Sequence, residues 1–142
     1  MKETELSAKL MAYLNKRADT DAIRIENIAA DCALDINYAI QRAQGWIETK
    51  IAKSQWLYFE RFQLPAMRKR ARVLGGRGVW VVAEVNGAVH MWRATAVFTA
   101  KREAYEKWTR IHFTWLPIAN YSTSFERPDW QGLVDTILAD ER

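Results

Sequence analysis

The stretch from Ile25 to Glu60 constrains the fold of this chain most, because two segments with helical spacing are followed by a β-favouring run. The spacing predicts a short helix over residues 26–33 and a longer helix that Asp35 would cap and that extends to Ile47. The apolar face of the longer helix consists of Ile36, Ala39, Ile40, Ala43, Trp46 and Ile47. This arrangement predicts a helix-turn-helix, in which the strand that starts near Trp56 would form a wing.

The opposite face of the longer helix carries side chains that suit the reading of DNA. These are Asn37, Tyr38, Gln41 and Arg42. Asn, Gln and Arg make bidentate hydrogen bonds to base edges, so we predict that this face enters a major groove. A plain three-helix bundle needs the same apolar face and leaves the same polar residues in solvent, and this alternative stays open. The pattern resembles helix-turn-helix proteins in general and selects no family.

Local patterns predict the remaining elements. Leu6, Leu10 and Leu14 indicate a first helix over residues 4–18. The run after Trp56 is typical of a strand, and Pro65 opens a short helix that ends at the glycines of residues 75–78. A β-hairpin is predicted over residues 79–98, with Asn86 and Gly87 at its turn. Residues 99–116 fit either a short helix followed by a strand, which we favour, or one helix, and a loop (residues 119–129) leads to a last helix over residues 128–140.

These elements predict an α+β fold. An N-terminal helix-turn-helix lobe, with or without a wing, would cover residues 1–62. An antiparallel β-rich lobe with a C-terminal helix would cover residues 63–142. With 142 residues the chain is near the usual size of one domain, so the alternative is one continuous domain that contains both regions.

Positive charge gathers in the second half of the chain. Residues 1–60 carry a net charge of −1 and residues 61–142 a net charge of +5, and no Asp or Glu occurs from Arg61 to Ala83. We predict that this basic segment contacts the phosphates of a nucleic acid through Arg68, Lys69, Arg70, Arg72 and Arg77. A solvated helix without a specific partner is the alternative. The predicted reading helix lies in the acidic half, so most of the phosphate affinity would come from the basic segment.

Motifs for catalysis or metal binding are scarce. The single cysteine, Cys32, excludes an intrachain disulfide, and with His90 and His112 it offers too few ligands for a zinc site. The carboxylates form no pair that is local in the sequence, and the nucleotide-binding and hydrolase motifs are missing. We therefore predict no enzymatic activity, no metal and no cofactor. A nuclease site assembled from distant residues, such as Glu84 or Glu103 with a histidine, stays open because spacing does not reveal it.

The sequence thus predicts a small DNA-binding regulatory or accessory protein, with DNA favoured over RNA. The pI near 9.3 fits a polyanionic partner. The alternative is a protein-binding inhibitor, immunity factor or adaptor that makes no nucleic-acid contact, which the seven tryptophans favour as interface residues. No stretch reaches the roughly 20 apolar residues of a membrane span, and the polar N-terminus does not suit a signal peptide. We expect a cytoplasmic protein that could form a homodimer.

Overall fold

The computed structural model describes residues 3–25, 35–102 and 108–141. In these residues the helices are α1 (Glu3–Lys16), α2 (Gln63–Val73), α3 (Ala94–Thr99) and α4 (Trp130–Asp140), with a 3₁₀ turn, η1 (Phe113–Trp115). The strands are β1 (Thr20–Arg24), β2 (Ile36–Ile40), β3 (Ala43–Ile51), β4 (Trp56–Glu60), β5 (Val79–Val85), β6 (Ala88–Arg93), β7 (Trp108–His112) and β8 (Tyr121–Ser124). Among the described helices, none is long and apolar enough to cross a membrane.

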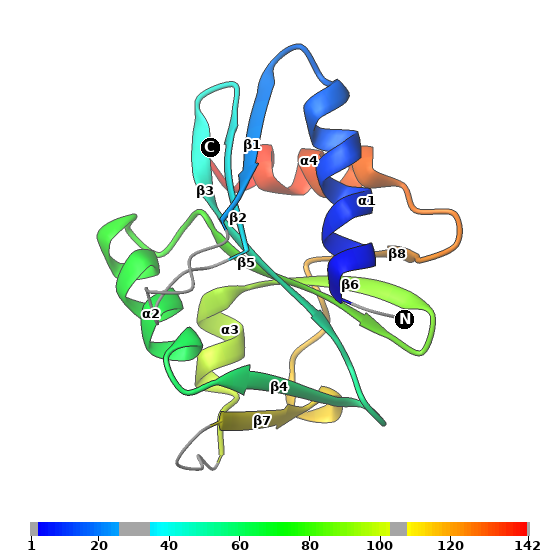
Figure 1. The fold of residues 1–142 in the computed structure, drawn as a ribbon. Helices are drawn as coiled ribbons and strands as arrows, with labels where there is room; N and C mark the ends of the chain where they lie inside the picture. The colour runs from blue at the N-terminus through cyan, green and yellow to red at the C-terminus, as the bar shows by residue number, and fades with distance from the viewer. Residues whose placement is uncertain (1–2, 26–34, 103–107, 142) are drawn as a thin grey trace.

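Six of the described strands form a mixed sheet in the order β1-β2-β3-β5-β6-β8. Strands β3 and β5 run parallel, and every other neighbouring pair is antiparallel. Strand β4 and helix α2 make the connection between β3 and β5, and β4 pairs with β7 in a separate sheet of two strands. The first and second halves of the chain thus meet in one sheet, where β3 lies beside β5 (Figure 1).

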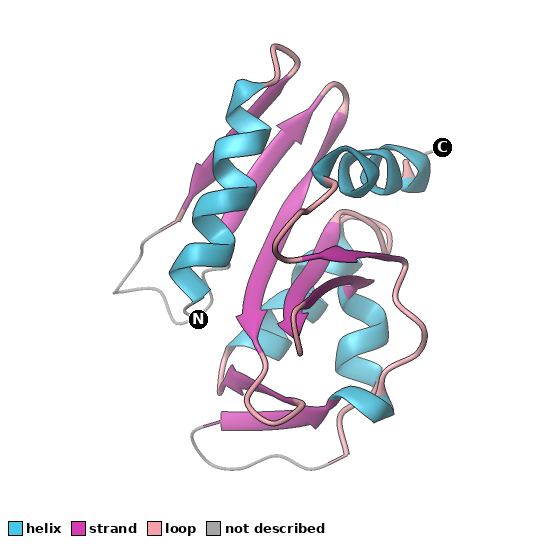
Figure 2. Ribbon diagram, turned by 90° about the vertical axis from the view of Figure 1, so that its right-hand side faces the viewer, coloured by secondary structure: helices cyan, strands magenta, loops and turns pink. Residues whose placement is uncertain are grey.

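Each face of the large sheet has its own apolar core. Helices α1 and α4 cover one face, where Leu6, Leu10 and Ile137 pack against Ile47 and Trp80. Helices α2 and α3 and the small sheet cover the other face (Figure 2), where the buried side chains include Met67, Val81, Trp92, Val97 and Ile111. Because both faces of the sheet are covered, β5 is buried along its whole length, and β3 is buried without alternation from Ile47 to Lys50.

The predicted helix-turn-helix lobe is wrong. Residues 36–47 form strand β2, a tight turn and the first half of β3, rather than one helix. Residues four apart share a face in a helix and also in a strand, so Ile36 and Ile40 fit both periods. The positive φ of Gln41, 53°, turns the chain back after β2, which a helix does not allow. The predicted helix over residues 26–33, together with Cys32, lies outside the described residues.

Several local predictions are confirmed. The first helix, the last helix, the helix around Pro65 and the strand after Trp56 are all present, although the boundaries differ by a few residues. Asn86 and Gly87 have positive φ values of 51° and 85° at the turn between β5 and β6, as a type I′ hairpin turn requires. The hairpin ends earlier than predicted, because residues 94–99 form α3, and residues 121–124 of the predicted loop form β8. Of the two readings of residues 99–116, the structure has a strand at 108–112.

Candidate active site

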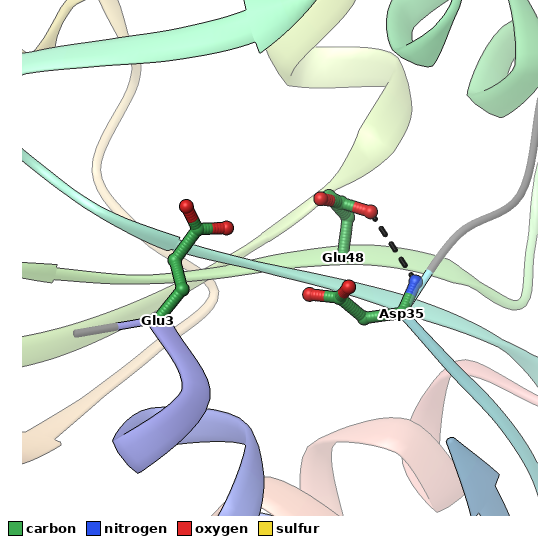
Figure 3. Close-up of side chains that lie close together, drawn as sticks. All are labelled: Glu3, Asp35 and Glu48. Carbon is green, nitrogen blue, oxygen red and sulfur yellow. Dashed lines mark hydrogen bonds between the residues drawn. The ribbon is translucent and has the colours of Figure 1, made fainter. Parts of the chain in front are cut away.

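Three carboxylates from distant parts of the chain meet beside β3, at the start of β2. Glu3 begins helix α1, Asp35 immediately precedes β2, and Glu48 lies in the middle of β3. Each offers an oxygen, and these oxygens all lie within 4.8 Å of one another (Figure 3). We call Glu3, Asp35 and Glu48 the acidic cluster.

The pairing of β2 with β3 places Asp35 beside Glu48. In the antiparallel register Ile36 faces Ile47, so the preceding Asp35 comes level with the residue that follows Ile47. The backbone N–H of Asp35 donates to Glu48 Oε1 at 3.3 Å (Figure 3), and the backbone N–H of Thr49 donates to Asp35 Oδ2 at 3.1 Å. The Thr49 hydroxyl also donates to Asp35 Oδ2. Asp35 is therefore held in place by the strand that carries Glu48.

Helix α1 brings the third carboxylate to the cluster. Its apolar side chains pack on the sheet, and near its start the buried Ser7 hydroxyl oxygen lies 3.5 Å from Thr49 Oγ1. The same hydroxyl donates to the backbone carbonyl of Glu3 at 3.2 Å. The first turn of α1 is thus tied to β3, and Glu3 faces Glu48 across the gap between them.

Lys50 lies on the same face of β3 as Glu48, because alternate residues of a strand point to the same side. Its Nζ atom is buried, 3.5 Å from Glu48 Oε2 and 3.8 Å from Glu3 Oε1. Nζ also donates a hydrogen bond of 2.8 Å to Oε1 of Gln63, the first residue of α2. The ammonium group therefore stands at the edge of the acidic cluster, opposite two of its members.

Gln63 connects this lysine with the cluster. Its Nε2 donates to Glu48 Oε2 at 2.9 Å, while its Oε1 accepts from Lys50 Nζ and from the backbone N–H of Glu60, each at 2.8 Å. Because one amide contacts both charged side chains and the end of β4, it fixes their mutual orientation.

Burial sets the protonation of Glu48. This side chain is 1% exposed, and its desolvation raises its pKa to about 8, with the charges of Asp35 and Glu3 adding to the effect and Lys50 opposing it. Burial also raises the pKa of Glu3, which Lys50 lowers and Asp35 raises further. Negative charge on the cluster is therefore costly without an added cation.

The donor set suits a hard divalent cation. All three side chains of the acidic cluster offer carboxylate oxygens, which are the ligands that Mg²⁺ and Mn²⁺ prefer, and no thiol or imidazole of the described residues joins them. A divalent cation would also offset the charge that burial opposes at Glu48. The expectation of no metal site was based on the absence of carboxylates close together in the sequence. The fold brings together the carboxylates of the acidic cluster, which are far apart in the sequence.

The residues predicted to read DNA do not share an outward face. Asn37 lies in β2 and donates from Nδ2 to the backbone carbonyl of Gly45 at 2.9 Å. Tyr38 is 1% exposed, and its hydroxyl accepts a 3.2 Å hydrogen bond from Trp80 Nε1. Gln41 and Arg42 are exposed in the turn after β2, at the opposite end of that strand from Asp35.

The basic segment, by contrast, lies mostly on one helix. Arg68, Lys69, Arg70 and Arg72 all project from α2, and Arg77 lies in the loop that follows this helix. The guanidinium of Arg70 lies 3.9 Å from the ring centroid of Trp46. A hollow of about 390 Å³ between α2 and α3 is lined by Leu64, Pro65, Arg68, Lys69, Arg72, Phe98 and Lys101. Arg77 lines a different hollow, beside Arg93 and Asp140.

Sequence reasoning missed every member of the acidic cluster, as well as Lys50 and Gln63. One signal was present: an Asp is followed thirteen residues later by a Glu-x-Lys, in which Glu48 and Lys50 would share a face of a strand. The predicted helix from Asp35 to Ile47 hid this signal, because it made Asp35 a cap and left Glu48 and Lys50 outside any predicted strand. Glu84, a candidate for a nuclease site assembled from distant residues, lies in β5, and its carboxylate accepts a hydrogen bond from the backbone N–H of Gly87.

The fold resembles that of a known DNA enzyme. The Holliday junction resolvase Hjc of the archaeon Archaeoglobus fulgidus aligns with a TM-score of 0.57 and 22% sequence identity, over 88% of this chain and 93% of the other. The bacterial homing endonuclease I-Ssp6803I aligns with a TM-score of 0.41 and 9% identity, over 98% of this chain and 94% of the other. No protein-family model matches the sequence, and no curated protein matches it either.

The prediction that this protein is not an enzyme is contradicted. It depended on the absence of a local carboxylate pair, whereas the structure assembles three carboxylates and a lysine at one place in a fold like that of Hjc. Folding alone brings these groups together, since 45 residues separate Glu3 from Glu48 in the sequence.

Proposed function

We propose that this protein is a metal-dependent nuclease that cleaves phosphodiester bonds in DNA, with branched DNA as its substrate. The observation that carries the proposal is the meeting of the acidic cluster with Lys50 beside β3, at the start of β2. The likeness to the fold of Hjc, a Holliday junction resolvase, supports both the reaction and the branched substrate.

In this proposal the acidic cluster holds a divalent cation. Asp35 and Glu48 are tied to each other through the backbone of β2 and β3, so their oxygens are fixed before a cation arrives. Glu3 supplies a ligand from the other side of the gap. A bound divalent cation would polarise the scissile phosphate and lower the pKa of an attacking water.

Lys50 contributes positive charge that stays in position. Its ammonium group is held by Gln63 Oε1 at 2.8 Å and lies 3.5 Å from Glu48 Oε2 of the acidic cluster. A fixed cation at this point stabilises the negative charge that develops on the phosphoryl oxygens during hydrolysis. Gln63 holds the side chains of Lys50 and Glu48 in a fixed relative position and is therefore a positioning residue.

The basic segment would hold the DNA backbone. Helix α2 begins at Gln63, at the catalytic groups, and its exposed side chains Arg68, Lys69 and Arg72 continue away from them. A phosphate backbone that follows this helix would pass from the hollow between α2 and α3 to the acidic cluster. Arginine and lysine supply the phosphate contacts that dominate affinity for DNA. Gln41 and Arg42 lie at the far end of β2 and have no part in this arrangement.

The test uses three labelled DNAs that share one sequence: a four-way junction, a linear duplex and a single strand. We expect the wild-type protein to cleave the junction in Mg²⁺ or Mn²⁺ and to stop cleaving when EDTA is added. Glu48→Gln should bind the junction and leave it intact. Absence of cleavage of all three DNAs with either cation would overturn the proposed nuclease, and equal cleavage of junction and linear duplex would overturn the branched substrate alone.

A further inference from the structure

The small sheet of β4 and β7 has two unlike faces. Its inner face carries Leu57, Phe59 and Ile111, which are fully buried against α2, α3 and the large sheet. The register pairs Trp56 with His112, Tyr58 with Arg110 and Glu60 with Trp108 on the outer face. Figures 1 and 2 show this pair of strands at one end of the molecule.

The outer face is a surface of aromatic rings. The ring centroids of Trp56 and His112 are 4.7 Å apart, those of Trp56 and Trp115 5.3 Å, and those of Tyr58 and Trp108 5.5 Å. We call these five residues the aromatic platform. None of the five belongs to the fully buried core, and Tyr58 is 36% exposed. Aromatic side chains that serve only as core are normally covered, whereas these are partly exposed and in contact with one another.

Cations surround the aromatic platform. Lys53 Nζ lies 5.9 Å from the Tyr58 ring centroid, and the guanidinium of Arg102 lies 4.5 Å from that of Trp115. Arg110 lies 4.2 Å from the ring centroid of Trp56. Exposed rings with interspersed cations are the combination that binds single-stranded nucleic acid, because bases stack on the rings while the cations contact phosphates.

Strand β4 connects the aromatic platform with the candidate active site. Strand β4 follows β3 within a few residues of Lys50, and paired backbone hydrogen bonds of 2.9 Å join Lys53 with Trp56 at its start. At its other end, the backbone N–H of Glu60 donates to Gln63, which contacts Glu48. The strand that carries Trp56 and Tyr58 is therefore anchored to the catalytic groups at its C-terminal end.

We propose that the aromatic platform binds the unpaired nucleotides of a single-stranded DNA segment and so directs the protein to DNA that contains unpaired bases next to a duplex. The inference rests on the proposed function for the identity of DNA as substrate. It adds a second contact surface: α2 holds the duplex backbone, and the platform holds bases that a continuous duplex does not expose.

Fluorescence anisotropy in EDTA tests binding without cleavage. The probes are a labelled thymidine oligonucleotide and a labelled blunt duplex. We expect Tyr58→Ala to weaken binding of the oligonucleotide by about five-fold or more, the loss of one stacked base, and to change duplex binding little. Tyr58→Phe keeps the ring and should bind as the wild type does. Phe62→Ala is the matched control, because Phe62 is also an exposed aromatic residue, at 41%, and lies outside the platform.

A second variant covers the case in which Tyr58→Ala does not fold. Arg102 is exposed and lies over Trp115, so Arg102→Gln should weaken oligonucleotide binding while melting at the wild-type temperature. Equal losses for oligonucleotide and duplex, or a Tyr58→Ala protein that behaves like Phe62→Ala, would overturn the inference. A protein that cleaves DNA without dependence on Tyr58 refutes the platform alone. A protein that binds the oligonucleotide through Tyr58 and cleaves no DNA refutes the nuclease alone, and one that binds neither probe and cleaves no DNA refutes both.

Discussion

Gln63 Oε1 accepts a hydrogen bond of 2.8 Å from Lys50 Nζ, while the Nε2 of the same amide donates to Glu48 at 2.9 Å. A single side chain at the start of α2 thus holds two charged groups of β3. Glutamine can do this because its amide has an acceptor and a donor on adjacent atoms, so it satisfies an ammonium and a carboxylate at once.

Replacement of Gln63 should therefore impair cleavage through position rather than folding. We expect Gln63→Ala to reduce the single-turnover rate by roughly 10–100-fold, the usual effect of removing a group that orients metal ligands. Titration with Mg²⁺ separates this role from a structural one, because a misplaced Glu48 raises the cation concentration needed for half-maximal rate. An unchanged Mg²⁺ requirement, together with a lower melting temperature, would contradict the positioning role.

Lys50 should be needed for hydrolysis and not for DNA binding. Lys50→Met keeps the apolar stem and removes the ammonium, so we expect the cleavage rate to fall about 10²-fold or more, as for loss of a group that stabilises transition-state charge. Since Lys50 lowers the pKa of Glu48, residual activity should also require a higher pH. Rates measured against pH, with junction affinity measured in EDTA, check both points. Wild-type rates in Lys50→Met would exclude its role.

Glu48 should make the stability of the metal-free protein depend on pH. Its pKa is raised to about 8 in the folded state from 4.5, so it favours folding when protonated, and this contribution is lost as the pH rises from 4.5 through 8. Mg²⁺ must displace the proton of Glu48. It should therefore raise the melting temperature more above the pKa of this group, at roughly pH 8.5, than below it, at roughly pH 6.

Glu48→Gln gives the matched comparison for this pH dependence. The amide is neutral at every pH, so the variant without metal should melt above the wild type under alkaline conditions and should gain little from Mg²⁺. Thermal melts of both proteins, with and without Mg²⁺, measure the difference. An equal Mg²⁺ effect on both proteins would show that the cation binds elsewhere.

The basic segment should supply salt-dependent affinity for duplex DNA. Loss of two phosphate contacts in the double variant Arg68→Ala/Arg72→Ala should reduce the slope of log affinity against log salt by about 2. The control is Lys16→Ala, which removes an exposed cation at the far end of α1. An unchanged slope in the double variant would show that DNA does not follow α2.

Gly45 should be sensitive to the smallest side chain. A Cβ atom at this position of β3 would lie 1.9 Å from the backbone oxygen of Gly78 and 2.5 Å from the Tyr38 hydroxyl. Since the first neighbour is backbone, we expect Gly45→Ala to lower the free energy of unfolding by roughly 3 kcal/mol or more, the upper end of the usual cost of overpacking. Gly75→Ala, with φ of +72° and no atom within 4 Å of its Cβ, should cost about 1 kcal/mol. Urea unfolding measures the free energy of unfolding of both variants, and equal losses of stability would contradict the steric cause.

The sequence by itself determined the elements whose signals are local. The Asn86-Gly87 turn, the apolar stripe of α1 and the alternation of β4 each depend on residues within a few positions, so their patterns predicted the structure. The basic character of α2 was equally visible, because no distant residue is needed to establish it.

Only the tertiary structure decided the nature of residues 36–47 and the location of the acidic cluster. Ile36 and Ile40 fit a helix and a strand equally, and pairing with β1 and β3 makes the segment extended. Once β2 and β3 pair, Asp35 reaches Glu48, and packing of α1 on the sheet adds Glu3. The physical reason is that a carboxylate site needs proximity in space, and here proximity comes from strand register and helix packing rather than from spacing along the chain.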